Sequence, residues 1–241
     1  MDRIFSETNV VFGDKYKHII KSLRHKVGDI IEVVKDKKLY LARIDEVKKS
    51  EFTFLIVEEL EDIENNLEIY LFQANIQKKK MEMVLKLNGM LALNSIVPFI
   101  SERTENKKLE DIDNERNYAI LTDSAEVSKA TRLTKIEKTM TTTDAITLAN
   151  TLDYAIVLYE SEETNSLFNF LNEIDCKFPG KLSVGIFVGP EGGFSEEEIT
   201  FFAERNVKPI RVFKSILRTE MAAFSTISAI LAYYERTRYE S

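Results

Sequence analysis

The sequence is poor in the residues that bind metals or form disulfides. Its 241 residues include one cysteine, two histidines and no tryptophan. The single Cys176 excludes an intramolecular disulfide, and both histidines, His18 and His25, lie far from it in the chain. We therefore expect no metal. No apolar run reaches the roughly 18 residues of a membrane span, and the N-terminus has no apolar signal region, so we expect a cytoplasmic protein without a membrane partner.

Glycine is also scarce, and its distribution is informative. Of the eight glycines, three lie within five residues, at Gly189, Gly192 and Gly193. The apolar run 182–188 before them predicts a buried strand, and Ser195 with Glu198 predicts a capping box that begins a helix. A glycine loop between a strand and a helix is typical of a ligand site. A simple Pro-Gly turn explains the loop equally well when the loop is considered alone.

The loop lacks the signatures of phosphate binding. It matches neither the GxxxxGK[ST] loop nor the GxGxxG turn, and Glu191 places a carboxylate where a phosphate would be repelled. Exposed backbone groups beside one carboxylate favour a neutral or cationic ligand. A nucleoside that carries a sulfonium has this chemistry.

Basic residues are concentrated near the N-terminus, although the net charge is −7. Residues 15–26 hold most of this cluster, including Lys17, His18, Arg24 and Lys26. Such a cluster can follow a phosphate backbone. Considered alone, it is explained better as a solvated lysine-rich surface.

Two patterns of hydrophobicity divide the chain. Residues 30–57 alternate as three β-strands, which predicts a small β-barrel or meander. An acidic run from Glu58 to Glu64 follows, and we place a domain boundary after residue 66, giving domains 1–66 and 67–241. The second domain alternates strands with helices. Strands are expected at 67–74, 95–100, 154–159, 182–188 and 209–213, with helices at 79–93, 111–132, 166–174, 195–205 and 219–238.

This alternation predicts a mostly parallel sheet covered by helices. Ligands in such sheets bind beyond the carboxyl ends of the strands. The loops after Tyr159, Val188 and Phe213 are therefore the candidate site. The last of them leads into Leu217-Arg218-Thr219-Glu220, which also fits a salt-bridged helix start with Thr219 as N-cap.

Together these motifs closely resemble the RsmE-type 16S rRNA uridine-N3 methyltransferases of the SPOUT superfamily. The resemblance spans nearly the whole chain. It is carried by residues 186–195 and 217–220, by Arg24 with Gly28-Asp29, by Lys80-Met81-Glu82, and by the segment from Ile96 and Pro98 to Ser101-Glu102-Arg103-Thr104.

The resemblance implies a PUA-like RNA-binding β-barrel followed by a SPOUT domain with a trefoil knot, working as a homodimer. It implies S-adenosylmethionine as cofactor and 16S rRNA of the small ribosomal subunit as partner. It also implies that Lys17, His18, Arg24 and Lys26, together with Arg103, bind RNA. By position, the cofactor would be held by Leu158, Tyr159, Glu160, Val188, Gly189, Pro190, Glu191, Gly192, Ile216, Leu217 and Arg218.

Methylation of uridine N3 requires removal of a weakly acidic proton. We expect Arg218 to stabilise the uridine anion, and Glu220 to act as general base because no histidine follows residue 25. The chain departs from the family pattern at Met90, Val127, Ala130 and Met221, which affects the helices expected to face RNA more than the cofactor loops. Two alternatives stay open: the same chemistry on another RNA such as tRNA, and a catalytically weakened RNA-binding ribosome-assembly factor.

Overall fold

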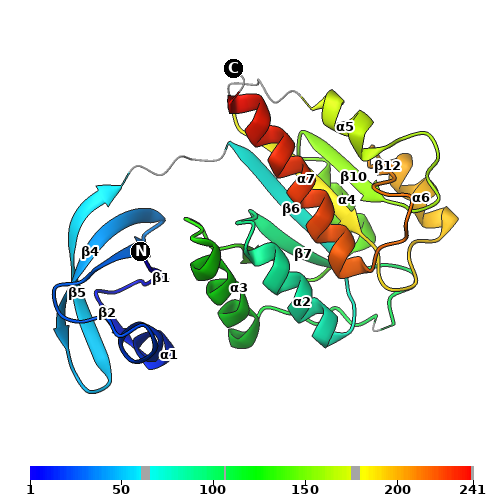
Figure 1. Ribbon diagram of the computed structural model, residues 1–241. Coiled ribbons are helices and arrows are strands. Elements are labelled where there is room, and N and C mark those ends of the chain that lie inside the picture. The colour runs from blue at the N-terminus through cyan, green and yellow to red at the C-terminus, as the bar shows by residue number, and fades with distance from the viewer. Residues whose placement is uncertain (61–65, 106, 175–179, 240–241) are drawn as a thin grey trace. The chain divides into compact units, whose positions relative to one another are not determined.

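The computed structural model describes residues 1–60, 66–105, 107–174 and 180–239, drawn in Figure 1. The chain forms two units, Met1–Glu64 with Thr122–Arg132, and Asn65–Leu121 with Leu133–Ser241. Cys176 and residues 61–65 of the predicted boundary lie outside the described residues. The division at residue 66 stays a prediction, and residues 122–132, which we had placed in the second domain, group with the N-terminal unit.

The N-terminal unit is built on a five-stranded sheet in the order β1-β3-β4-β5-β2. The three long strands, β3 (Ile30–Lys35), β4 (Lys38–Val47) and β5 (Glu51–Leu60), form the predicted antiparallel meander. Strands β1 (Arg3–Phe5) and β2 (Val10–Phe12), the turn of helix α1 (Gly13–Tyr16) and the π-helix η1 (Lys17–Ser22) were not predicted. Elements this short carry too few residues to show a period.

Contacts with β1 explain why residues 122–132 belong to this unit. The Glu126 carboxylate accepts a hydrogen bond from the Phe5 amide at 3.0 Å and pairs with Lys15 Nζ at 3.1 Å. Arg3 donates to the Lys129 carbonyl. The C-terminal end of helix α3 (Glu115–Ser128) is thus bonded to the barrel. These partners are more than a hundred residues away in sequence, so periodicity alone could not assign them.

The C-terminal unit contains a seven-stranded sheet in which every pairing is parallel. The order is β12-β10-β11-β6-β7-β8, and β9 also pairs with β7. The strand bounds are β6 Leu67–Ala74, β7 Ser95–Ile100, β8 Lys135–Ile136, β9 Met140–Thr141, β10 Tyr154–Leu158, β11 Leu182–Val188 and β12 Lys208–Ile210. The predicted parallel sheet is confirmed.

Helices cover both faces of this sheet (Figure 1). Helices α2 (Lys78–Gly89), α5 (Leu167–Glu173) and α7 (Thr219–Tyr239) pack on one face, and α4 (Thr142–Ala149) and α6 (Glu196–Ala203) on the other. Neighbouring strand residues alternate between the two cores, so Leu71 and Ile186 face α7 while Phe72 and Phe187 stack on the opposite side at 4.3 Å. Helix α4 was missed because its threonines have low helix propensity.

One predicted strand is shorter than expected. The apolar run suggested residues 209–213, but β12 ends at Ile210. From Arg211 the chain bonds instead to the loop after β10: the Arg211 amide donates to Asn165 O at 2.9 Å, and the Leu167 amide donates to Arg211 O at 3.0 Å. The pairing of β12 with β10 therefore ends at Ile210. Residues 211–218 form a loop at the carboxyl edge of the sheet.

Candidate functional site

A cavity of about 530 Å³ lies at the carboxyl edge of the C-terminal sheet. The loops after β10, β11 and β12, the three that the sequence singled out, line it together. Its volume falls in the range of small-molecule sites. Of the eleven residues predicted to hold a cofactor, all but Gly192 line the cavity, and so does Glu220. The structure therefore brings the predicted cofactor and catalytic residues to one place.

Residues 189–193 are called here the glycine loop. Their glycines permit a close-packed turn. Gly193 has φ +65°, a conformation that favours glycine, and its amide donates to Pro190 O at 3.0 Å. A Cβ atom on Gly189 would lie 3.2 Å from the buried ring of Phe194. A Cβ atom on Gly193 would lie 3.3 Å from Glu160 Oε1. The backbone is thus packed between Phe194 and the loop after β10.

Three side chains from other elements hold the glycine loop. Thr219, at the start of α7, donates its hydroxyl to Gly189 O at 2.7 Å. Lys80, in the first turn of α2, donates to Glu191 Oε1 at 2.9 Å. Arg103, in the loop after β7, donates from Nη1 to Gly192 O at 3.0 Å. The loop is fixed at its beginning, middle and end.

Glu191 is part of this scaffold. The sequence predicted that its carboxylate faces a neutral or cationic ligand, but the structure shows its Oε1 paired with Lys80. Burial is the largest single influence and raises the pKa of Glu191, but the hydrogen bond and charge of Lys80 together with backbone hydrogen bonds outweigh it, so the pKa lies below its ordinary value. Glu191 is therefore ionised near neutral pH. The ion pair with Lys80 is a tertiary contact that the loop sequence did not indicate.

The segment Ser101–Thr104 docks onto the helix that follows the glycine loop. The predicted capping box is confirmed, because Ser195 Oγ accepts from the Glu198 amide and the Glu198 carboxylate accepts from the Ser195 amide. Ser195 Oγ also donates to Glu102 Oε2 at 2.5 Å, and the Glu102 amide donates to Glu198 Oε1 at 2.7 Å. Arg103, predicted to bind RNA, is exposed and its guanidinium contacts the glycine loop.

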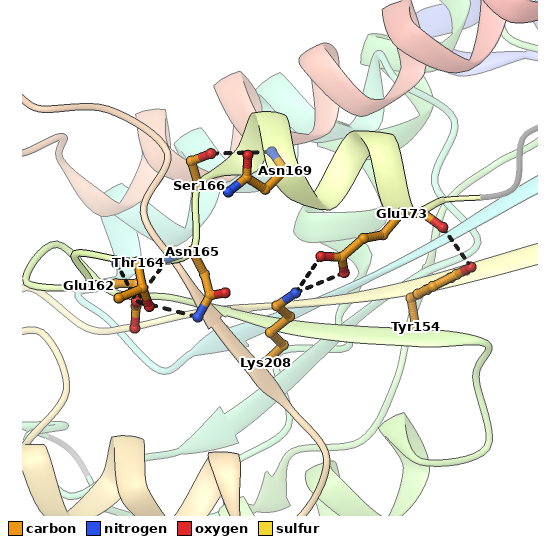
Figure 2. A network of polar contacts seen from close by, with 8 residues as sticks. All are labelled: Tyr154, Glu162, Thr164, Asn165, Ser166, Asn169, Glu173 and Lys208. Atoms are coloured by element: carbon orange, nitrogen blue, oxygen red, sulfur yellow. Dashed lines mark hydrogen bonds and ion pairs between the residues drawn. The ribbon is translucent and has the colours of Figure 1, made fainter.

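The loop after β10 is ordered by one carboxylate. Glu162 accepts hydrogen bonds from the Thr164 hydroxyl at 2.6 Å, the Thr164 amide at 2.8 Å and the Asn165 amide at 3.0 Å (Figure 2). The bond from the Thr164 hydroxyl is the main cause that lowers the pKa of Glu162. Because Asn165 O also accepts from the Arg211 amide, this turn sets the course of both loops.

A second group of contacts holds helix α5 beside that loop (Figure 2). The Ser166 hydroxyl accepts from the Asn169 amide at 3.2 Å and caps the helix. At the other end of α5, Glu173 pairs with Lys208 of β12 at 2.7 Å, and its carbonyl accepts from the Tyr154 hydroxyl at 3.2 Å. The loops at this side of the cavity therefore rest on an anchored helix.

Arg218 and Glu220 lie at the N-terminal end of α7, and both line the cavity. Within the described residues they form no ion pair, and the Arg218 guanidinium makes no hydrogen bond. Thr219 is the first helical residue and bonds Gly189 O, so the alternative of a salt-bridged helix start with Thr219 as N-cap is wrong. In the described part of the chain, Glu220 Oε2 is buried and lacks a hydrogen-bond partner. A buried acceptor beside an unpaired cation is an arrangement suited to proton transfer and anion stabilisation.

The four basic residues predicted to bind RNA, Lys17, His18, Arg24 and Lys26, are exposed and belong to the N-terminal unit. Lys17 and His18 lie in η1, and the segment that holds Lys26 is an ordered turn. Asp29 accepts from the Lys26 amide at 2.8 Å and contacts His25 Nδ1 at 3.2 Å. That backbone bond is the main cause that lowers the pKa of Asp29. The RNA-binding role of these residues stays a prediction.

Over the residues that the structure describes, no group of three or more His, Cys, Asp or Glu side chains is arranged to hold a metal ion. None of the described helices is long and apolar enough to cross a membrane.

Comparison with known proteins identifies two families of domains in this chain. The model of an RNA methyltransferase domain matches residues 63–231, and that of an RNA methyltransferase PUA domain matches residues 13–57. The "Ribosomal RNA small subunit methyltransferase E" of Rickettsia conorii is 26% identical over 90% of this chain and 87% of its own length. The protein of the same name from Aquifex aeolicus is 28% identical over 83% of this chain and 84% of its own.

A crystal structure of a ribosomal RNA small subunit methyltransferase E from Neisseria gonorrhoeae, bound to S-adenosyl methionine, is similar in fold. It superposes with a TM-score of 0.78 at 22% identity and covers 96% of this chain and 97% of its own. The predicted fold class, a PUA-like domain followed by an α/β domain with a parallel sheet between helices, is confirmed.

Proposed function

This chain belongs to the RNA methyltransferase family, and on that premise we propose that it transfers a methyl group from S-adenosylmethionine to N3 of a specific uridine in 16S rRNA of the small ribosomal subunit. The proposal rests on one observation. The loops after β10, β11 and β12 meet around one cavity, and the loop after β11 is the glycine loop. The names of the relatives from Rickettsia and Aquifex support the small subunit rRNA as substrate and favour it over tRNA.

The cavity fits S-adenosylmethionine. Its volume of about 530 Å³ suits a nucleoside-sized ligand, and its lining combines glycine-loop backbone with apolar side chains such as Leu158 and Ile216. The Glu160 carboxylate lies within the lining and suits a cationic ligand better than a phosphate. When bound, S-adenosylmethionine supplies an activated methyl group.

The residues of this chain have separate roles in the proposed reaction. The backbone around Gly189 and the loop residues 158–160 and 216–218 hold the cofactor. Glu220 accepts the N3 proton, because one of its carboxylate oxygens is enclosed and has no hydrogen-bond partner in the described structure. Arg218, with no partner of its own in the described structure, stabilises the negative charge that develops on the uracil oxygens. A base within a duplex hides its N3 proton, so the target uridine must be unpaired or flipped out.

Contact with the RNA falls to Lys17, His18, Arg24 and Lys26 of the PUA-like unit, with Arg103 at the glycine loop. The net charge of −7 makes bulk electrostatic attraction to RNA weak, so recognition rests on this basic cluster and on shape. Our proposal includes a homodimer, a trefoil-knotted path through the last loops and action in the cytoplasm.

Transfer of tritium from labelled S-adenosylmethionine tests the function. We expect labelling of 30S subunits from cells that lack this gene, with N3-methyluridine identified by mass spectrometry, and little labelling of tRNA or naked 16S rRNA. Equal or greater labelling of tRNA would refute the substrate. Cofactor binding without transfer to any of these RNAs would instead favour a binding factor over an enzyme.

Two variants of α7 test the assignment of the base. Glu220→Gln keeps the shape of the side chain and removes its basicity, so we expect loss of transfer with retained cofactor binding. Glu235→Gln makes the same change at an exposed position of the same helix and serves as the control. Intact turnover in Glu220→Gln would rule out Glu220 as the general base.

A further inference from the structure

Gln73, next to the last residue of β6, has a polar side chain in a fully buried place. Its relative exposure is 0%, and its neighbours in the strand, Phe72 and Ala74, are core residues. The amide Nε2 donates to Ala74 O at 3.1 Å and to Thr219 Oγ1 at 3.1 Å. In the described structure, Oε1 is buried without a hydrogen-bond partner. A buried amide with an unpaired oxygen is less stable than an apolar residue of similar size, so packing alone does not account for glutamine here.

The contact with Thr219 has a defined polarity. An amide nitrogen can only donate, so the Thr219 oxygen is the acceptor in that bond. The single hydroxyl hydrogen of Thr219 is then directed to Gly189 O, which lies 2.7 Å away. The three residues form a relay in which Gln73 fixes the hydroxyl of Thr219 and Thr219 fixes the glycine loop.

The relay joins three elements that meet at the cavity: the end of β6, the glycine loop after β11, and the first turn of α7. Gly189 and Thr219 both line the cavity, and Thr219 stands between Arg218 and Glu220. The bond from Thr219 fixes the position of the Gly189 carbonyl at the edge of the cavity.

We propose that Gln73 is a positioning residue of the cofactor site. It touches neither cofactor nor substrate. It acts through Thr219 to keep the glycine loop and the start of α7 in fixed positions relative to each other. The inference rests on the proposed function for the identity of the ligand, but the relay itself is a property of the ligand-free protein.

Hydrogen–deuterium exchange of the ligand-free protein tests the relay whether or not the chain transfers a methyl group. Thr219→Val removes the hydroxyl and keeps the shape, and Gln73→Met removes the amide. We expect each to speed amide exchange about tenfold in peptides covering 189–195 and 217–222, because Thr219→Val removes the donor to Gly189 O and Gln73→Met removes the donor that fixes the orientation of the Thr219 hydroxyl. Thr219→Ser, which retains the hydroxyl, should remain within about threefold of the wild type.

Thr226→Val is the matched control. Thr226 is also a fully buried threonine of α7, and its hydroxyl donates only to Ala222 O within its own helix. This variant should lower the melting temperature to a similar extent without faster exchange in residues 189–195. Equal exchange in that segment for Thr219→Val and Thr226→Val would overturn the relay.

Cofactor affinity, measured by calorimetry, separates a positioning role from a general loss of stability. We expect Gln73→Met and Thr219→Val each to weaken S-adenosylmethionine binding about tenfold, and the double variant to be no more than about twofold worse than either. Losses that multiply in the double variant would show that the two residues act independently and would refute the proposal. A wild type that binds cofactor but transfers no methyl group would contradict the proposed function and leave the exchange and affinity tests of the relay in force.

Discussion

Replacing Lys80 with Met or Glu191 with Gln removes the ion pair that fixes the middle of the glycine loop to α2. Each change is close in shape and removes one charge. We expect both single variants to loosen the loop and to weaken S-adenosylmethionine binding to a similar extent. The double variant should be no worse than either single variant, since both act through the same contact.

The size of the effect follows from the geometry. The Nζ and Oε1 atoms are 2.9 Å apart, which corresponds to roughly 1.4 kcal/mol of attraction at the dielectric constant of water. The Lys80 and Glu191 side chains are 37% and 29% exposed, so solvent screening and lost side-chain freedom offset part of the gain. We expect a net coupling of about 1 kcal/mol, or about fivefold in affinity.

The stability that the pair contributes should depend on pH in a defined direction. The pKa of Glu191 is lowered in the folded protein from its ordinary 4.5, because burial, which raises it, is outweighed by the hydrogen bond and charge of Lys80 together with backbone hydrogen bonds. The contribution is therefore fully present above pH 4.5 and is lost as the pH falls through the lower, folded-state pKa. Denaturant unfolding curves of the wild type and Glu191→Gln should differ at pH 7 and converge in acid.

Calorimetric titration of the wild type, the two single variants and the double variant gives the coupling energy. The ion pair between Lys181 and Glu68, 3.3 Å apart at the beginnings of β11 and β6, is the control, because neither residue lines the cavity. Disrupting it should change stability but not affinity. A loss of affinity in Glu191→Gln that is absent from Lys80→Met would refute this reasoning and show that the Glu191 carboxylate contacts the ligand directly.

Three further changes probe the packing around the site. Gly189→Ala places a Cβ atom 3.2 Å from the buried Phe194 ring. We expect the unfolding free energy, measured in urea, to fall by about 1–3 kcal/mol. An unchanged urea midpoint of unfolding would contradict this packing. Ser195→Ala removes the cap of α6 and should destabilise the protein by about 1 kcal/mol. Glu162→Gln weakens the turn closed by Thr164, so proteolysis in that loop should be faster than in the wild type at pH 7. The difference in proteolysis rate should disappear as the pH falls below 4.5, because Glu162 of the wild type then becomes protonated.

Several elements could be predicted accurately because their signals are local. Strands β6, β7 and β11 have the predicted bounds, since each is an apolar run that ends at a turn or helix signal. The capping box at Ser195 requires residues only three apart. Helix α4 and the short strands β8 and β9 were missed because their residues, rich in threonine and lysine, show neither a strong period nor high propensity.

The candidate site was predicted as a set of positions but not as a set of contacts. The three strand-end loops and the residues at the mouth of α7 follow from the rule that parallel strands present their carboxyl ends at one edge. The partners of those residues did not follow. Glu191 was assigned to a ligand and pairs with Lys80, and Arg103 was assigned to RNA and holds Gly192 O. Gln73 was not singled out by any pattern.

The sequence by itself determined the alternation of strands and helices, the glycine loop, and the edge of the sheet at which the candidate site lies. These depend on periodicity and turn chemistry, which act over a few residues. The tertiary structure alone decided which side chains hold that loop. Lys80 and Glu191 are 111 positions apart, and Gln73 and Thr219 are 146 apart. They meet because the strand order places β11 beside β6 and brings the start of α7 over both, and no local pattern encodes that order.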